Sequence, residues 1–261
     1  MSGAGATGRT YLVTGSASGI GAATARLIES RGGRVIGCDL TDADIEVDLS
    51  TARGRAALVE QARGRGRIDA VLAIAGGGKR GIIETNFFGA VATLDGLRPQ
   101  LSESPAPRAV AISSTASLSA AEERVVQACL DGDEAAAVRY ASELPPQSAP
   151  DAYGCAKRAL NRWVRRVAPT SAWAGAGIAL NVVAPGVVDT PAAAWIMETP
   201  AARAAIEAAA PQPFGGFPGQ PAWIAELILW LASEANQFVT GQIIFADGGA
   251  EVSLVGERHW M

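Results

Sequence analysis

The sequence is short of the residues that metal centres and disulfide-bonded proteins require. It has one histidine, His259, close to its end, and three cysteines, Cys38, Cys129 and Cys155, that lie far apart and form no C-x-x-C motif. A catalytic zinc site needs several converging ligands, and a Ser-His-Asp hydrolase needs a histidine beside a buried nucleophile. We therefore expect no metal site and neither of these chemistries. An odd number of dispersed cysteines also argues against a disulfide framework and favours the cytoplasm.

Long apolar runs and blocks of one charge are missing as well. The best candidate for a membrane span, residues 222–232, is too short and contains Glu226, and the first ten residues lack the apolar stretch of a signal peptide. The net charge is −4 and no basic block occurs, which argues against nucleic acid and anionic membranes as partners. Hydrophobic residues make up 49% of the 261 residues, enough for one continuous core.

A glycine-rich turn near the N-terminus is the first positive feature. A short apolar strand runs into a turn that contains Gly15, Gly19 and Gly21, and a helix follows. Glycines let the backbone approach a ligand closely, and the start of a helix attracts a diphosphate. Alternatively, these glycines serve only a tight strand-to-helix turn. The second strand, 34–38, ends in Asp39, whose carboxylate can accept both hydroxyls of an adenosine ribose, and this favours a dinucleotide site.

The same carboxylate indicates which dinucleotide is preferred. The charge of Asp39 repels the 2′-phosphate of NADP. Neither Ser18 nor Leu40 offers a cation that would compensate this repulsion. We therefore predict NAD as the cofactor.

Apolar strands alternate with helical segments along the rest of the chain. Further strands are expected at 45–49, 68–76, 107–114, 178–184 and 242–246. Six or seven strands that alternate with helices indicate an α/β fold, a single-domain Rossmann-type doubly wound parallel sheet. We expect one domain over residues 9–261, preceded by a disordered tail over residues 1–8.

An insertion at about residues 118–149 interrupts this alternation. Its apolar residues repeat at helical spacing, and Asp131-Gly132-Asp133 divides the segment in two. Leu144-Pro145-Pro146 stops the second helix. The segment is thus predicted to be a helical hairpin with one apolar face per helix, which suits either a lid or an interface.

Tyr153 and Lys157 stand four positions apart on the helix after this hairpin, so they share one helix face. This spacing alone is a weak signal, but it follows the glycine turn, Asp39 and Ser114 in that order. The turn reads Thr14-Gly15-x-x-x-Gly19-x-Gly21. Together these residues resemble the short-chain dehydrogenase/reductase family, and the resemblance covers nearly the whole chain.

The resemblance implies four catalytic roles. Tyr153 would act as the general base toward an alcohol, its pKa lowered from ~10 by the ammonium of Lys157 and by the positive nicotinamide. Ser114 would hold the substrate oxygen, and Asn86 would fix a water that connects Lys157 to solvent. The residues expected to bind the cofactor are Gly15, Ser18, Gly19, Ile20, Asp39, Asp48, Leu49, Ala75, Gly76, Tyr153, Lys157, Pro185, Gly186, Val188 and Thr190.

Some positions leave alternatives open or depart from the family pattern. Asp48 would meet the adenine edge, but Asp48 or Ser50 could also cap the helix 51–65. The stretch 73–76 reads Ala-Ile-Ala-Gly where the family usually has Asn-Asn-Ala-Gly. A loop, 77–83, replaces a helix, and the next helix starts near Glu84. The short loop and the long insertion together resemble the bacterial hydroxysteroid dehydrogenases and carbonyl reductases of the family.

The segment 190–218 bears on the substrate. It is rich in Ala, Pro and Gly, and it is either a substrate-covering loop or a long surface excursion. Trp195 and Met197 within it favour a small apolar alcohol or ketone, such as a cyclic, aromatic or steroidal one. A dinucleotide-sensing regulator with weak catalysis is the alternative function, but it predicts loss of Ser114, Tyr153 or Lys157. An extended epimerase or dehydratase would need a longer C-terminal domain.

Assembly is predicted from large apolar residues near the C-terminus. Trp223, Leu227 and Trp230 lie on the helix expected at 221–234, and the strand 242–246 follows. Burying such area in a two-fold contact is the commonest route to a dimer. We expect a homodimer through these elements, or a tetramer if the inserted hairpin also pairs, which sedimentation analysis can test.

Overall fold

A computed structural model describes residues 5–77, 81–144 and 151–258. These residues form a seven-stranded parallel sheet of order β3-β2-β1-β4-β5-β6-β7. The strands are β1 (Thr10–Thr14), β2 (Arg34–Asp39), β3 (Ile45–Glu46), β4 (Ala70–Ala73), β5 (Arg108–Ile112), β6 (Ala179–Pro185) and β7 (Ile243–Ala246). The order reverses between β1 and β4, and ligands of such sheets bind at the carboxyl ends of the strands near this point. The predicted doubly wound sheet is confirmed.

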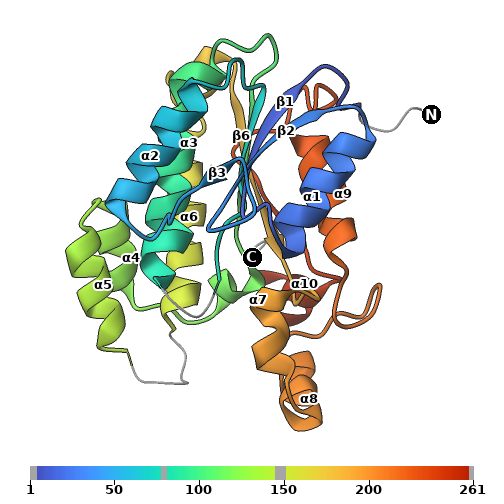
Figure 1. The fold of residues 1–261 in the computed structure, drawn as a ribbon. Helices are drawn as coiled ribbons and strands as arrows, with labels where there is room; N and C mark the ends of the chain where they lie inside the picture. The colour runs from blue at the N-terminus through green and yellow to red at the C-terminus, as the bar shows by residue number, and fades with distance from the viewer. Residues whose placement is uncertain (1–4, 78–80, 145–150, 259–261) are drawn as a thin grey trace.

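Helices cover both faces of the sheet (Figure 1). On one face lie α1 (Gly19–Ser30) and α9 (Pro221–Leu231), which pack against each other. The other face carries α2 (Ala52–Arg63), α3 (Ala90–Leu101) and α6 (Ala152–Val167). Every residue of β4 and β5 is buried, as expected for strands covered on both sides.

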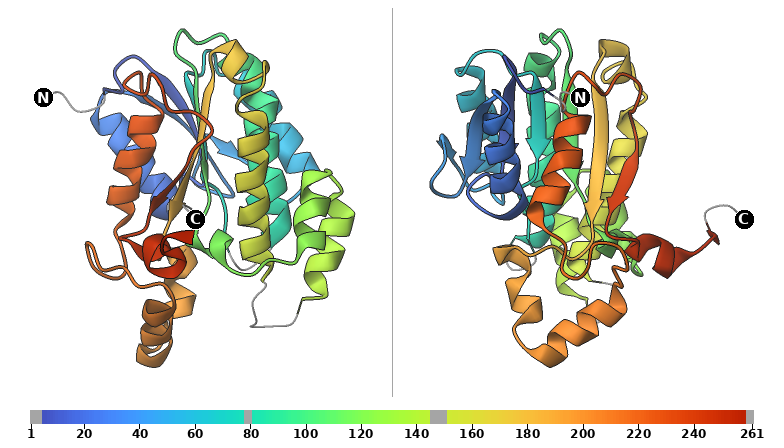
Figure 2. Two further views of the ribbon diagram at one scale, coloured as in Figure 1. Left: turned by 180° about the vertical axis from the view of Figure 1, so that it is seen from behind. Right: turned by 90° about the vertical axis from the view of Figure 1, so that its right-hand side faces the viewer.

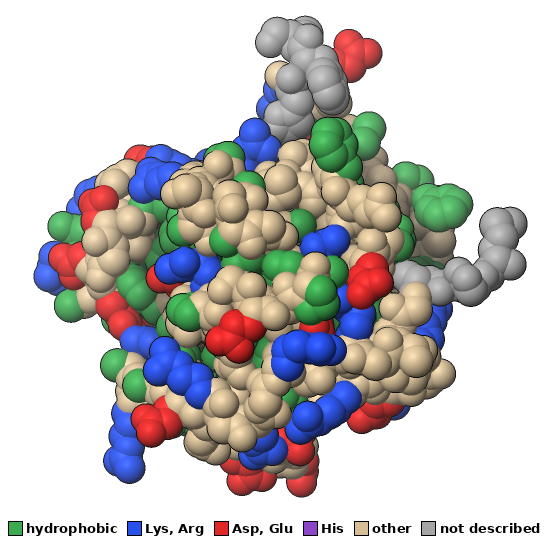
Figure 3. All heavy atoms as spheres, turned by 90° about the horizontal axis from the view of Figure 1, so that it is seen from above, with side chains coloured by type: hydrophobic (Ala, Val, Ile, Leu, Met, Phe, Trp, Pro, Cys, Tyr) green, Lys and Arg blue, Asp and Glu red, His purple; other side chains and the backbone are tan. Residues whose placement is uncertain are grey.

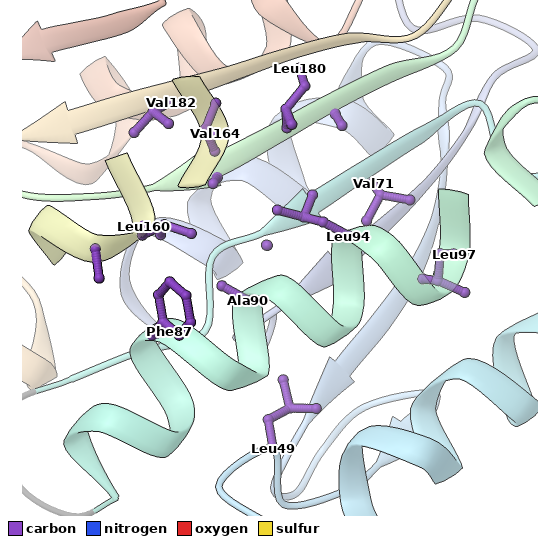
Figure 4. Packing of buried hydrophobic residues seen from close by; sticks show 14 of the residues in the cluster. Leu49, Val71, Phe87, Ala90, Leu94, Leu97, Leu160, Val164, Leu180 and Val182 are labelled. Atoms are coloured by element: carbon purple, nitrogen blue, oxygen red, sulfur yellow. The ribbon is translucent and has the colours of Figure 1, made fainter. Parts of the chain in front are cut away.

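The core on the α2–α3–α6 face is continuous from the sheet to the helices. Figure 4 shows Phe87, Ala90 and Leu94 facing Leu160 and Val164 of α6. All five side chains are buried, so this contact fixes α6 relative to the segment that precedes α3. The apolar pattern of α6 thereby determines where its polar residues, including Lys157, are placed.

The insertion is a helical hairpin, as predicted. It consists of α4 (Glu123–Leu130) and α5 (Glu134–Ser142), and a short 3-10 helix, η2 (Thr115–Leu118), precedes it. The Asp133 carboxylate caps α5 by accepting a hydrogen bond from the amide of Ala136. Residues 145–150, the end of the predicted insertion, lie outside the described residues.

A second excursion extends beyond the carboxyl ends of the strands. It contains α7 (Pro191–Ala194), the 3-10 turn η4 (Trp195–Met197) and α8 (Pro200–Ala209), which project from the body of the molecule (Figure 2). The amide of Phe214 donates to the carbonyl of Gly248, so the end of the excursion is attached to the segment before α10 (Ala250–Val255).

Two local predictions need correction, and a third gains detail. Residues 5–8 are ordered, because Ala6 is fully buried and the amide of Gly8 donates to Gly32; residues 1–4 lie outside the described residues. The cap of α2 is Thr51, whose side chain accepts from the amide of Gly54. Neither Asp48 nor Ser50 is this cap: the Asp48 Oδ1 accepts from the amide and the hydroxyl of Ser50 instead. The helix predicted to start near Glu84 does so, but its first six residues, η1 (Glu84–Gly89), form a π-helix.

The three cysteines are free and buried. Burial raises the pKa of the Cys38 and Cys129 thiols to about 12, and it raises the pKa of Cys155 as well. The Cys155 sulfur accepts a hydrogen bond from the amide of Glu122, which attaches the start of the hairpin to α6.

The surface carries charges of both signs, interspersed on the face that Figure 3 shows. No helix in the described residues is both long and apolar enough to traverse a lipid bilayer. On α9, Trp223 is 53% exposed and Trp230 38% exposed, and β7 is the edge strand of the sheet. The homodimer through these elements remains a prediction.

Candidate active site

The glycine turn has the geometry that a diphosphate site requires. Gly15 and Gly19 have φ values of +71° and +53°, a region that favours glycine. A Cβ on Gly21 would collide with the carbonyl oxygen of Gly15, so only glycine lets α1 pack this close to the turn. The N-cap residue Ser18 makes no side-chain capping bond, and the first amides of α1, including that of Ile20, are therefore available to an anion.

Asp39 lies beside this turn at the end of β2. Its Oδ2 accepts from the amide of Ala17 at 2.9 Å, and its Oδ1 accepts from the amide of Leu40 at 2.7 Å. Each carboxylate oxygen can accept a second hydrogen bond. The carboxylate is therefore oriented by the turn and can still accept ribose hydroxyls, so these residues fit a dinucleotide.

Thr14 joins the turn to the end of β4, where the family's two asparagines are missing. Its Oγ1 accepts from the amides of Ile74 and Ala75, each at 3.0 Å. A Cβ on Gly15 would lie 3.0 Å from the Cα of Ala75, so the two strand ends are in close contact. One hydroxyl thus stabilises the junction between the predicted binding residues Gly15 and Ala75.

Replacing Thr14 by valine is expected to lower the free energy of unfolding by about 2 kcal/mol, because the Ala75 amide loses its acceptor and the Ile74 amide keeps only the carbonyl of Leu72. Thr24→Val is the matched control. Thr24 is also buried, but its hydroxyl donates only to a carbonyl within α1, so its loss should cost about 1 kcal/mol or less. Urea unfolding measures both values, and equal losses in the two variants would contradict this role of Thr14.

Ser114, Tyr153 and Lys157 come together at the carboxyl end of β5. Ser114 follows this strand, and a hydrogen bond joins its side chain to that of Tyr153. The Nζ of Lys157 lies 5.5 Å from the centroid of the Tyr153 ring and donates to the carbonyl of Ile112 at 2.8 Å. The structure therefore groups the three predicted residues, with Lys157 only 2% exposed.

Burial strongly affects the electrostatics of this group. Burial raises the pKa of Tyr153, and the hydrogen bond from Ser114 offsets only part of this effect. Burial also lowers the pKa of Lys157 to about 7. In the protein alone desolvation therefore dominates the pKa of Tyr153. The prediction that Lys157 and the bound nicotinamide together lower this pKa concerns the cofactor complex and stays a prediction.

Asn86 is fully buried in η1 and faces the same site. Its Nδ2 donates to the carbonyls of Gly77 and Ile82, both at 2.8 Å, whereas its Oδ1 has no protein partner. A Cβ on Gly76 would collide with this oxygen and would lie 3.4 Å from the Nζ of Lys157. A buried acceptor without a partner fits a bound water here, and the predicted water beside Lys157 remains a prediction.

The other cofactor residues lie on two further segments. Leu49 is buried against η1 below α3 (Figure 4), and Asp48 precedes it at the surface. Pro185 ends β6 and Val188 is buried. The methyl group of Thr190 would lie 3.2 Å from a Cβ on Gly19, which brings the 185–190 loop to the glycine turn.

Gln212 is a site residue that the sequence did not reveal. It is 8% exposed, its Nε2 donates to the carbonyl of Val187 at 3.1 Å, and a Cβ on Gly186 would collide with that nitrogen. Gln212 therefore holds the 185–190 loop in place. No local pattern indicates this contact, because 25 positions separate Gln212 from Val187.

The predicted substrate residues belong to the excursion. Trp195 is 42% exposed and Met197 is partly buried, both on η4. Their role stays a prediction. Within the described parts of the chain, no three His, Cys, Asp or Glu side chains form a group that could hold a metal ion.

Three features define a short-chain dehydrogenase/reductase. They are the parallel sheet whose strand order reverses between β1 and β4, the glycine turn, and the Ser114–Tyr153–Lys157 group. A family model described as enoyl-(acyl carrier protein) reductase matches residues 15–251, and the chain belongs to the short-chain dehydrogenase/reductase family. It is similar to 3-alpha-hydroxysteroid dehydrogenase/carbonyl reductase of Comamonas testosteroni, with 34% identity over 93% of this chain and 96% of the relative.

Two further similarities agree with this. Cis-4-hydroxycyclohexanecarboxylate dehydrogenase of Sinomonas cyclohexanicum is 33% identical over 92% of this chain and 96% of the relative. The crystal structure of the 3-alpha-hydroxysteroid dehydrogenase from Pseudomonas sp. B-0831, complexed with NADH, superposes with a TM-score of 0.84. It is 36% identical and is matched over 94% of this chain and 98% of that chain.

Proposed function

We propose that this protein is an NAD-dependent oxidoreductase that interconverts a secondary alcohol and a ketone, with Tyr153 as the general acid and base. The observation that carries the proposal is the grouping of Tyr153 with Ser114 and with the buried amine of Lys157. The names of two relatives, a 3-alpha-hydroxysteroid dehydrogenase/carbonyl reductase and a cis-4-hydroxycyclohexanecarboxylate dehydrogenase, support a cyclic substrate.

The roles of the residues follow from their contacts. When bound, NAD would accept the hydride from the alcohol carbon. Ser114 would hold the substrate oxygen next to Tyr153, whose phenolate removes the proton during oxidation and whose hydroxyl returns it during reduction. Lys157 would bind the nicotinamide ribose, and its charge would stabilise the Tyr153 phenolate. Asn86, Gly76 and Lys157 would enclose the ribose side of the site.

Turnover of a panel of secondary alcohols with NAD, followed by cofactor absorbance, tests this function. The panel should contain steroidal, cyclic and aromatic alcohols as well as short charged hydroxy acids. We expect the cyclic and steroidal alcohols to be oxidised with the highest kcat/KM. Absence of turnover on every member would favour a dinucleotide sensor, and strict selectivity for a short hydroxy acid would contradict the apolar substrate.

The cofactor preference is tested separately at Asp39. We expect kcat/KM to be at least about 100-fold higher with NAD than with NADP, because the carboxylate and a 2′-phosphate repel each other. Asp39→Asn should reduce this ratio by about tenfold or more. Asp42→Asn, on the exposed turn after β2, is the control and should leave the ratio unchanged. A preference for NADP in the unmodified protein would refute the charge argument.

A further inference from the structure

An ion pair connects the inserted hairpin to α2, the helix that follows the predicted adenine-binding residues Asp48 and Leu49. The Oε2 of Glu134, the first residue of α5, lies 2.5 Å from the Nη2 of Arg55 on α2. Figure 1 shows α5 below α2 on the outside of the helix layer. Arg55 is only 8% exposed, so its guanidinium needs this partner more than a surface arginine would.

The other side of the same guanidinium holds the 48–50 loop. The Nη1 of Arg55 donates to the carbonyls of Leu49 at 3.2 Å and Ser50 at 3.3 Å. These carbonyls belong to the loop that contains the predicted adenine contacts Asp48 and Leu49. Arg55 therefore contacts the hairpin and this loop at the same time.

The loop is enclosed from the opposite side by glycines of the η1 region. A Cβ on Gly81 would lie 2.7 Å from the Cβ of Ser50, and a Cβ on Gly89 would lie 3.3 Å from that of Leu49. The loop is therefore held between η1 on one side and Arg55 on the other. Without the contacts from Arg55, the carbonyls of Leu49 and Ser50 lose the donor that holds them on that side.

We propose that the hairpin positions the adenine-side loop, residues 48–50, through the Glu134–Arg55 ion pair. This rests on the proposed dinucleotide function, and it gives the hairpin a role that differs from a lid or an interface. Loss of the Glu134 charge leaves the Arg55 guanidinium buried without a counterion. The guanidinium then moves toward solvent and releases the two carbonyls.

Glu134→Gln, with Glu123→Gln as the matched control, tests the proposal. Glu123 lies on the same hairpin and also forms an ion pair, with Arg162 of α6, but this pair does not contact the 48–50 loop. Two measurements are made on the full chain of each variant. Hydrogen exchange of the 45–51 peptide reports on the loop, and NADH fluorescence titration reports on cofactor affinity.

For Glu134→Gln we expect at least about fivefold faster exchange in 45–51 and about tenfold weaker NADH binding, with kcat at saturating cofactor unchanged. Glu134→Asp, which keeps the charge, should recover most of the affinity. Glu123→Gln should behave like the wild type in both measurements. Unchanged exchange in Glu134→Gln, or equal effects in the two Gln variants, would overturn the proposal. Faster exchange together with no NADH binding in any protein, the wild type included, would retain the coupling and refute the dinucleotide function instead.

Discussion

Tyr153→Phe is expected to reduce kcat by about a thousandfold while leaving NADH affinity nearly unchanged. The variant keeps the ring that packs beside Lys157 and loses only the hydroxyl that bonds to Ser114. Positioned general acid–base groups contribute about 10²- to 10⁴-fold to rate, which sets the size of the effect. Steady-state kinetics with a saturating alcohol and a fluorescence titration with NADH measure the two quantities.

Tyr140→Phe provides the control for this experiment. Tyr140 lies on α5 within the hairpin, and the guanidinium groups of Arg124 and Arg139 contact its ring. Its hydroxyl should have no effect on kcat. A Tyr153→Phe enzyme that turns over like the wild type would eliminate Tyr153 as the acid and base.

The pH dependence of oxidation adds a second constraint. In the protein alone, burial raises the pKa of Tyr153, so the phenolate is scarce near neutral pH. Efficient oxidation below pH 10 therefore requires that the bound cofactor and the charged form of Lys157 lower this pKa in the complex. The pH at which kcat/KM is half-maximal measures how much of this lowering occurs.

Lys157→Met is expected to make the protein more stable at pH 6 and at the same time much less active. The pKa of Lys157 falls from 10.5 to about 7 on folding, so at pH 6 the folded protein holds a buried charge that the unfolded chain solvates freely. Between pH 7 and about 10 the unfolded state binds more protons, and the stability of the wild type relative to the variant rises with pH. Removing the buried charge at pH 6 raises the free energy of unfolding by at most about 5 kcal/mol. Loss of the hydrogen bond to the Ile112 carbonyl lowers it by about 1 kcal/mol.

Thermal unfolding of both proteins at pH 6 and pH 10 measures this difference, and it should shrink at the higher pH. Activity should fall by about 100-fold or more in Lys157→Met. Lys157→Arg is the control for charge, because an arginine keeps its proton throughout this range. A stability difference that is the same at both pH values would mean that packing, and not the buried charge, is responsible.

The features that the sequence predicted well are those decided by local backbone or by helix spacing. The turn with Gly15, Gly19 and Gly21 needs glycine for its own geometry, and four positions on a helix suffice to place Tyr153 and Lys157 on one face. The hairpin was predictable because Asp131-Gly132-Asp133 ends one helix and caps the next through local interactions that do not depend on tertiary contacts. The family resemblance added the roles of the residues but not their surroundings.

Features that depend on distant contacts were missed or misjudged. Gln212 contacts the 185–190 loop only because the excursion folds back along the sheet. Arg55 is a buried partner of Glu134 only because the hairpin, which packs against α6 and η1, brings Glu134 to the Arg55 side chain. The pKa of Tyr153 depends on how deeply its ring is buried, and residue types alone do not give this depth. The π-helical turn at Asn86 similarly depends on packing against α6.

The three buried thiols can be used to measure local opening of the structure. A thiol whose pKa is near 12 and that has no access to solvent does not react with an alkylating reagent until the surrounding structure opens. Cys38 lies in the sheet, Cys129 in the hairpin and Cys155 in the helix that carries Tyr153. The rates at which these three residues are alkylated would therefore report on the opening of each of these three parts of the molecule, without any substitution.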